Sequence, residues 1–204
     1  MSNALEKLFG GANRIKIMRL FLLNQDLFFD AEDVSKRSKV GLLNTRKELK
    51  FLENIGFVKK KGIKKEILSK SKKKLKKTVG YYLNNNFQYK EALRGLLSMD
   101  NFLKKGELTS RFKGHGKIKL LVVAGAFLQN KDCRVDLLVV GDNLNKKALE
   151  DKVKTIESEL GQELCYAIFD TNEFIYRMNM YDKLIRDILD FPNEHLIDTG
   201  EIST

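Results

Sequence analysis

The residues from Leu42 to Val58 read LLNTRKELKFLENIGFV, and from Lys59 to Lys77 the chain continues KKKGIKKEILSKSKKKLKK. The first stretch has the three- and four-residue apolar spacing of a helix, and Gly56 is placed to end that helix in a left-handed conformation. β-Favouring residues flank the lysines on both sides, as Phe57-Val58 and as Val79 to Leu83. The sequence therefore predicts a helix followed by a β-hairpin with lysines on its arms and tip.

The basic charge of this chain is local. Eleven lysines and one glutamate give residues 59–77 a formal charge of +10, against +11 for all 204 residues, so the rest of the chain is close to neutral. Such a dense charge favours a polyanionic partner, and a nucleic-acid backbone is the commonest one in cells. An anionic membrane surface is an alternative partner. The simplest interpretation is a solvated lysine tract that has no partner and only keeps the protein soluble.

The residues before Leu42 predict further helices. Apolar spacing over Ala4 to Leu23, interrupted by Gly10-Gly11, indicates a short helix and a longer one that ends near Asn24. A short extended piece follows at Leu27 to Phe29, and Asp30 can cap a helix that runs to about Ser38. A tight turn at residues 39–42 then joins this helix to the one described above, which makes a helix-turn-helix.

One face of the second helix of this pair is polar. Leu42, Thr45, Leu49 and Leu52 share the face expected to pack inward, which leaves four residues outward: Asn44, Arg46, Lys47 and Lys50. Asparagine can bind adenine and arginine can bind guanine through two hydrogen bonds each, while lysine neutralises phosphate. Taken alone, this face is more typical of an ordinary exposed face on a structural helix. The adjoining basic hairpin makes it a candidate DNA-reading surface.

The first half resembles the winged helix-turn-helix repressors of the arsenic-repressor type. The resemblance covers roughly residues 4–87 and lies in RIKIMRLFLLN, AEDVSKRS, NTRKELKFLENIGFV and YYLNNNF. It implies that the hairpin is a wing, longer and more basic than usual. The predicted base-reading residues are then Asn44, Arg46, Lys47 and Lys50, and the predicted backbone contacts are Lys59, Lys60, Lys61, Lys64, Lys65, Lys70, Lys72, Lys73, Lys74, Lys76 and Lys77.

The second half predicts a small α/β domain. A connecting helix is expected over residues 86–99 and a short helix over 102–112. After them come buried strands at Ile118 to Ala124 and Val135 to Val140, a helix at Asn145 to Leu160, a strand at Leu164 to Phe169, and a final helix to about Leu189. Asp170 and Glu173 resemble a capping box at the start of that last helix, and Pro192 follows its end.

This half resembles the minimal nucleotidyltransferase domain of the polymerase-β superfamily, whose signature is Gly-Ser after the first strand, Asp-x-Asp on the second and a third carboxylate on a later strand. In that family the carboxylates hold two Mg²⁺ ions for phosphoryl transfer. Here Gly125 matches the glycine, Ala126 replaces the serine, Arg134 replaces the first aspartate and Asp136 matches the second. The third carboxylate position falls near Cys165.

An arginine in place of a metal ligand sets a fixed cation against the metals, so the resemblance implies a degenerate transferase site with no metal or cofactor. Asp132 lies roughly 13 Å from Asp136 along an extended strand, too far to serve as a displaced ligand unless the chain folds back. The expected role of Asp136 is an ion pair or a hydrogen bond with Arg134, which lies two residues away on the same face of the strand.

Composition argues against a disulfide-rich, zinc-binding, secreted or membrane protein. The two cysteines, Cys133 and Cys165, form no CxxC or Cys/His cluster, so neither a disulfide framework nor a zinc site is signalled, and both are expected to be small core residues. The start of the chain has no signal-peptide pattern, and the longest apolar run, Leu120 to Leu128, is under half a membrane span. We therefore expect a cytoplasmic protein without a membrane partner.

The expected fold is α+β, with a winged helix-turn-helix domain over residues 1–85, a connecting helix over 86–100 and a nucleotidyltransferase-like domain over 101–204. The expected function is that of a transcriptional regulator that binds double-stranded DNA at specific sequences. The C-terminal domain would then serve for contact with a ligand, with a second copy in a homodimer or with another partner. The alternatives are an active Mg²⁺-dependent nucleotidyltransferase with a winged-helix docking domain, and an RNA-binding protein.

Overall fold

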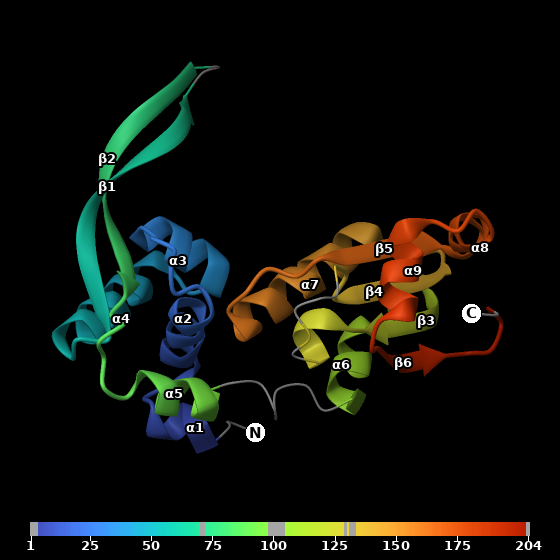
Figure 1. The fold of residues 1–204 in the computed structure, drawn as a ribbon, viewed down its shortest axis with the longest axis horizontal. Coiled ribbons are helices and arrows are strands. Elements are labelled where there is room, and N and C mark those ends of the chain that lie inside the picture. Colours follow the sequence, from blue (N-terminus) through green and yellow to red (C-terminus); the bar gives the residue numbers. More distant parts are fainter. Residues whose placement is uncertain (1–3, 70–71, 98–104, 129, 131–133, 203–204) are drawn as a thin grey trace. The chain divides into compact units, whose positions relative to one another are not determined.

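The computed structural model describes residues 4–69, 72–97, 105–128, 130 and 134–202; the side chains of residues 67–69, 72–74 and 105 lie outside this description. Contacts divide the chain into two compact units: unit 1 comprises Met1–Ser98 and Glu157–Gln162, and unit 2 comprises Met99–Ile156 and Glu163–Thr204. The fold is α+β, with helices and a wing-like hairpin in unit 1 and a mixed sheet with helices in unit 2 (Figure 1).

The helices of unit 1 follow the predicted order: α1 (Ala4–Leu8), α2 (Ala12–Leu23), α3 (Ala31–Ser38), α4 (Leu42–Asn54) and α5 (Lys90–Leu97). Asp30 caps α3 as expected, because its Oδ1 accepts a hydrogen bond of 2.8 Å from the backbone N–H of Asp33. Lys39 takes a left-handed conformation in the turn to α4, and Gly56 does so after α4 with φ of 76°. Local signals therefore set the ends of both helices.

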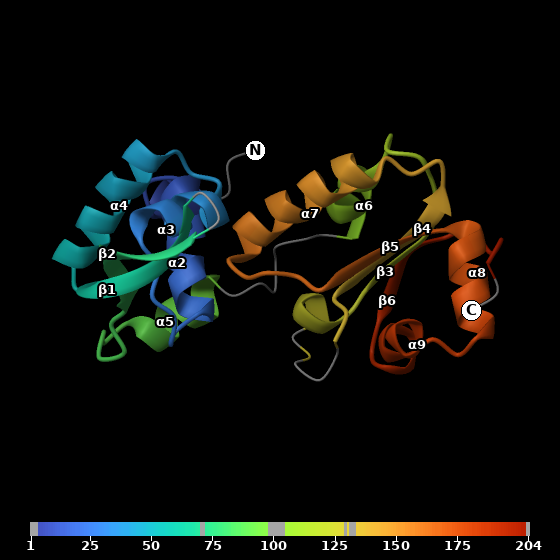
Figure 2. The same ribbon diagram turned by 90° about the horizontal axis from the view of Figure 1, so that it is seen from above.

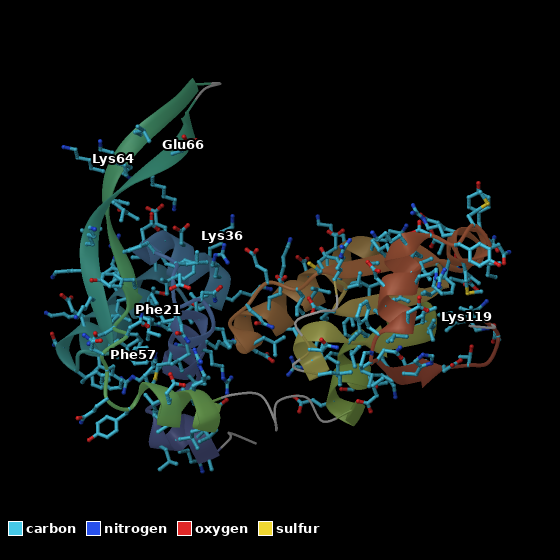
Figure 3. The ribbon with its side chains drawn as sticks, viewed as in Figure 1. Phe21, Lys36, Phe57, Lys64, Glu66 and Lys119 are labelled. Carbon is cyan, nitrogen blue, oxygen red and sulfur yellow. The ribbon has the colours of Figure 1, made fainter. Side chains whose placement is uncertain are left out.

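The core of unit 1 collects the apolar faces of α2, α3 and α4. Ile17 and Phe21 from α2, Val34 from α3 and Leu49 from α4 are fully buried and belong to one cluster with Phe57. Figure 3 shows Phe21 and Phe57 among these elements. The Phe21 ring meets the Phe29 ring edge-on, with centroids 5.8 Å apart. This packing holds α3 and α4 in a fixed relation to each other.

The hairpin of unit 1 is formed by β1 (Val58–Ser69) and β2 (Lys72–Leu83), which pair antiparallel from Val58↔Leu83 to Ser69↔Lys72. We call these two strands the wing. The strands are longer than the β-favouring residues alone predict, because the lysine-rich stretch is itself paired. At the base, the backbones of Phe29 and Tyr81 exchange two hydrogen bonds of 2.9 and 2.8 Å, which confirms the extended piece expected before α3.

Unit 2 contains a four-stranded sheet in the order β5-β4-β3-β6: β3 (Lys117–Val123), β4 (Leu137–Asp142), β5 (Tyr166–Asp170) and β6 (Glu194–Asp198). β4 pairs with β5 in parallel, whereas β3 pairs antiparallel with both β4 and β6. β4 is buried along almost its whole length and β3 is buried from Leu120 to Val123, as continuous apolar runs predict.

Helices cover both faces of this sheet. α6 (Lys105–Phe112) and α7 (Lys146–Leu160) lie on one face, and α8 (Thr171–Asn179) and α9 (Lys183–Asp190) lie on the other (Figure 2). A short 3₁₀ turn, η1 (Gly125–Leu128), follows β3. Phe174 from α8 and Ile185 from α9 join the sheet residues Leu120 and Leu138 in one buried cluster. No helix among the described residues is both long and apolar enough to cross a lipid bilayer.

Two predictions for the end of unit 2 were wrong, and one strand was missed. The final helix is two helices, because Tyr181 takes a left-handed conformation and the Asp182 carboxylate accepts a hydrogen bond of 2.8 Å from the N–H of Leu184, which starts α9. The strand β6 beyond Pro192 was not expected. The capping box does not form, since Asp170 makes no side-chain cap and instead lies 3.3 Å from Lys146.

The expectation that the cysteines are core residues was wrong for Cys165. This residue is exposed and lies just before β5. Cys133 lies outside the described residues.

Candidate nucleic-acid interface

The outward face of α4 carries the four residues expected to read bases. Asn44, Arg46, Lys47 and Lys50 are all exposed, whereas Thr45, Leu49 and Leu52 on the opposite face are buried. The helix therefore turns its amide and its three cations to solvent, as the sequence spacing predicts.

Three interactions hold α4 in place. Nε of Arg14 in α2 donates a hydrogen bond of 2.7 Å to Glu48, and the Arg14 guanidinium lies 3.8 Å from the centre of the Phe51 ring. Thr45, which is fully buried, donates from Oγ1 to the carbonyl of Val40. The exposed face of α4 thus belongs to a rigidly packed helix, which is what specific recognition of a groove requires.

The wing carries most of the remaining positive charge of unit 1. Six of its lysines have described, exposed side chains: Lys59, Lys60, Lys61, Lys64, Lys76 and Lys77. Figure 3 shows Lys64 projecting from β1. The backbones of Lys72, Lys73 and Lys74 lie in β2. Their side chains, and all of Lys70, fall outside the described residues.

Two of the predicted backbone-contacting lysines form ion pairs with carboxylates, and one of them, Lys60, also remains exposed. Nζ of Lys60 lies 2.8 Å from Glu53 of α4. Nζ of Lys65 lies 2.9 Å from Oδ2 of Asp30 and 2.6 Å from Oδ1 of Asp33. Sequence patterns do not separate these two lysines from the others, because their partners lie elsewhere in the chain.

The carboxylates alter the ionisation of Lys65 and Asp30. Burial lowers the pKa of Lys65, but its hydrogen bonds to Asp33 and Asp30 outweigh that effect and leave the pKa above its ordinary value. Burial raises the pKa of Asp30, but the Lys65 ammonium and the backbone N–H of Asp33 outweigh it and leave that pKa below its ordinary value. Both groups are therefore charged at neutral pH.

A hollow of about 200 Å³ lies where α3, α4 and the wing meet. Its lining joins a base-reading candidate from α4 to exposed and carboxylate-bound lysines from the wing: Asp30, Ala31, Glu32, Arg46, Lys65, Lys76, Thr78 and Val79. Arg46 and Lys76 therefore belong to one continuous surface. The structure brings the polar face of α4 and the basic wing together, although 30 residues separate these two cations in the sequence.

Three of the positions that were compared with the transferase signature, Gly125, Ala126 and Asp136, meet in space in unit 2. Oδ1 of Asp136 accepts a hydrogen bond of 2.7 Å from the N–H of Ala126, and Oδ2 accepts one of 2.8 Å from the N–H of Cys165. Gly125 has φ of +48°, and the carboxylate of Asp136 occupies the place that a Cβ at Gly125 would take. The end of β3, the start of β4 and the start of β5 are thus joined by one aspartate.

The expected ion pair between Asp136 and Arg134 is not formed. Arg134 is largely exposed and lies 3.8 Å from Asp187, while both oxygens of Asp136 are engaged by backbone amides. Asp132 lies outside the described residues. Within the part of the chain that the structure describes, no cluster of three or more His, Cys, Asp or Glu residues could hold a metal ion.

The chain was compared with known protein families, with curated proteins and with solved structures, and none of the three comparisons finds a match.

Proposed function

We propose that this chain is a sequence-specific transcriptional regulator that binds double-stranded DNA through a winged helix-turn-helix formed by unit 1. In this proposal α4 enters the major groove, where Asn44 and Arg46 read base edges and Lys47 and Lys50 contact bases or flanking phosphates. The exposed wing lysines bind the neighbouring backbone or minor groove.

One observation carries the proposal: Arg46 of α4 and Lys76 of the wing border the same hollow, so the candidate reading helix and the lysine-rich strands adjoin each other. An α-helix fits the major groove of B-DNA, which is ~12 Å wide, and an adjoining basic hairpin then lies over the flanking phosphates. A solvated lysine tract alone would not need to adjoin an exposed face of asparagine, arginine and lysine.

For unit 2 we propose a contact role, towards a ligand, a second copy in a homodimer or another partner, rather than transfer chemistry. The support is that both carboxylate oxygens of Asp136 accept hydrogen bonds from the backbone. A carboxylate whose two oxygens both accept backbone hydrogen bonds already has a structural role. In addition, the sequence has Arg134 where the transferase signature has its first aspartate, so one of the expected metal ligands is replaced by a cation.

Salt dependence of DNA binding tests the proposed function. Replacing Lys61, Lys64 and Lys77 together by alanine should weaken binding to all duplex sequences. It should also reduce the slope of log K against log salt by about 2.7, at about 0.9 for each phosphate that is no longer neutralised. Fluorescence anisotropy at several salt concentrations measures this slope.

A matched control removes the same charge elsewhere. Lys147, Lys152 and Lys154 are exposed on α7, and replacing these three by alanine should leave the slope unchanged. Equal slopes for both triple variants would show that net charge alone drives binding and would refute the wing as a DNA contact. Tighter binding to single-stranded or duplex RNA than to any selected DNA site would reassign the partner. A palindromic selected site would indicate a homodimer.

A further inference from the structure

The wing projects far beyond its support. Each strand has 12 residues, and among the described residues the only β-bridge from outside the hairpin to its strands is the Phe29↔Tyr81 pair near the base. An isolated two-stranded hairpin is marginally stable in water. In addition, Lys64 lies opposite Lys77 and Lys65 opposite Lys76, and like charges in such pairs are destabilising. The outer part of the wing needs an attachment to the rest of unit 1.

Lys65 makes that attachment. Its ammonium contacts two carboxylates at the start of α3, Asp30 at 2.9 Å and Asp33 at 2.6 Å. The side chain of Asp30 is only 8% exposed, and its other oxygen caps α3 through the N–H of Asp33. Asp30 therefore fixes both the first turn of α3 and the position of a wing lysine 35 residues later in the chain.

We propose that Lys65 is a positioning residue that ties the wing to α3 and so sets the angle between the wing and α4, rather than a phosphate contact. This inference rests on the proposed function for its effect on DNA, but the attachment itself belongs to the free protein. Removal of the lysine leaves the Asp30 carboxylate buried without its cation, which is unfavourable for the local structure. The wing then samples orientations in which its exposed lysines no longer match the backbone beside the groove that α4 enters.

Lys64 provides a matched comparison, because it neighbours Lys65 on β1, carries the same charge and points to the opposite face of the strand. Its side chain is exposed, and it makes no ion pair with the residues that the structure describes. Replacing either lysine by glutamine removes one positive charge from the same strand. Any difference between the two variants therefore reports position and not charge.

The first measurement is amide hydrogen exchange of β1 and β2 in the free protein. Lys65→Gln should accelerate exchange in the wing beyond the Phe29 bridge by about fivefold or more, whereas Lys64→Gln should leave it unchanged. Asp33→Asn should also accelerate exchange, although it alters neither the wing sequence nor the Asp30 cap. Unchanged exchange in both Lys65→Gln and Asp33→Asn would overturn the attachment, whether or not the chain binds DNA.

The second measurement is the salt dependence of DNA affinity. Lys65→Gln should lower affinity with almost no change in slope, whereas Lys64→Gln should reduce the slope by about 0.9. Asp33→Asn removes a negative charge, so simple attraction predicts tighter binding, while release of the wing from α3 predicts weaker binding. A slope reduced equally by both lysine variants would make Lys65 an ordinary phosphate contact. Absence of DNA binding by the unaltered chain would refute the proposed function and leave the exchange result to decide the attachment.

Discussion

Replacement of Asp136 tests whether this residue holds unit 2 together. Asp136→Ala deprives the N–H groups of Ala126 and Cys165 of their acceptors. Hydrogen bonds to a charged group contribute about 1.5 to 3 kcal/mol each, and the half-buried position of Asp136 favours the lower end. We therefore expect the free energy of unfolding of unit 2 to fall by about 3 kcal/mol, and by about half as much for Asp136→Asn, which keeps one acceptor oxygen.

Urea unfolding of the full chain, followed by NMR signals from β4, measures this change for unit 2 separately from unit 1. Asp190→Ala is the control, since Asp190 is a carboxylate of the same unit that is 58% exposed and paired with Arg186 four residues earlier. Such a pair contributes at most about 0.5 kcal/mol. Equal effects of Asp136→Ala and Asp190→Ala would refute the structural role. A gain in stability for Asp136→Ala would point instead to a carboxylate kept for binding a metal or substrate.

Three further predictions concern single sites. Arg46→Ala should reduce the preference for the selected DNA site over random DNA by about 1 to 3 kcal/mol, and Asn44→Ala should have an effect of the same size at a different base. Competition binding measures both effects. Equal losses of affinity for selected and random DNA would exclude base reading by these residues. Acidification should loosen the wing: the folded-state pKa of Asp30 lies below the ordinary 3.8, so its stabilisation is present above that value and is lost as pH falls through the folded-state pKa. Hydrogen exchange of the β1 amides, measured as a function of pH, would follow this loss of stabilisation. Exchange protection that stays unchanged as Asp30 becomes protonated would contradict the prediction. Gly125→Ala should destabilise unit 2 by at least about 1 kcal/mol in urea unfolding, because a Cβ there meets the Asp136 carboxylate at a positive φ; a neutral effect would mean that η1 adjusts freely.

Much of the fold was predictable from short-range patterns. Asp30 and Gly56 mark helix ends because a cap depends on neighbouring backbone groups only. The break between α8 and α9 has a local signal as well, since Asp182 is a suitable N-cap within an otherwise helical run. The strand β6 has little signal, because its residues are only half-buried and its pairing with β3 joins segments some 70 residues apart.

The candidate interface also combines features that the sequence predicts with features that it does not. The exposed face of α4 follows from helical periodicity, so Asn44 and Arg46 could be located from sequence alone. The wing could be located too, because β-favouring residues flank the lysines. The roles of the individual lysines could not be separated, since eleven identical side chains differ only in what lies opposite them.

The sequence by itself determined the α+β class, the order of the helices and the concentration of charge in residues 59–77, because these depend on spacing and composition within short windows. Only the tertiary structure decided that Lys65 meets Asp30 and Asp33, that Arg46 and Lys76 share one surface, and that Asp136 binds two backbone amides and not Arg134. The physical reason is that each of these contacts joins atoms brought together by packing of the helices and pairing of the strands, and neither periodicity nor composition specifies which distant residue will lie at hydrogen-bonding distance.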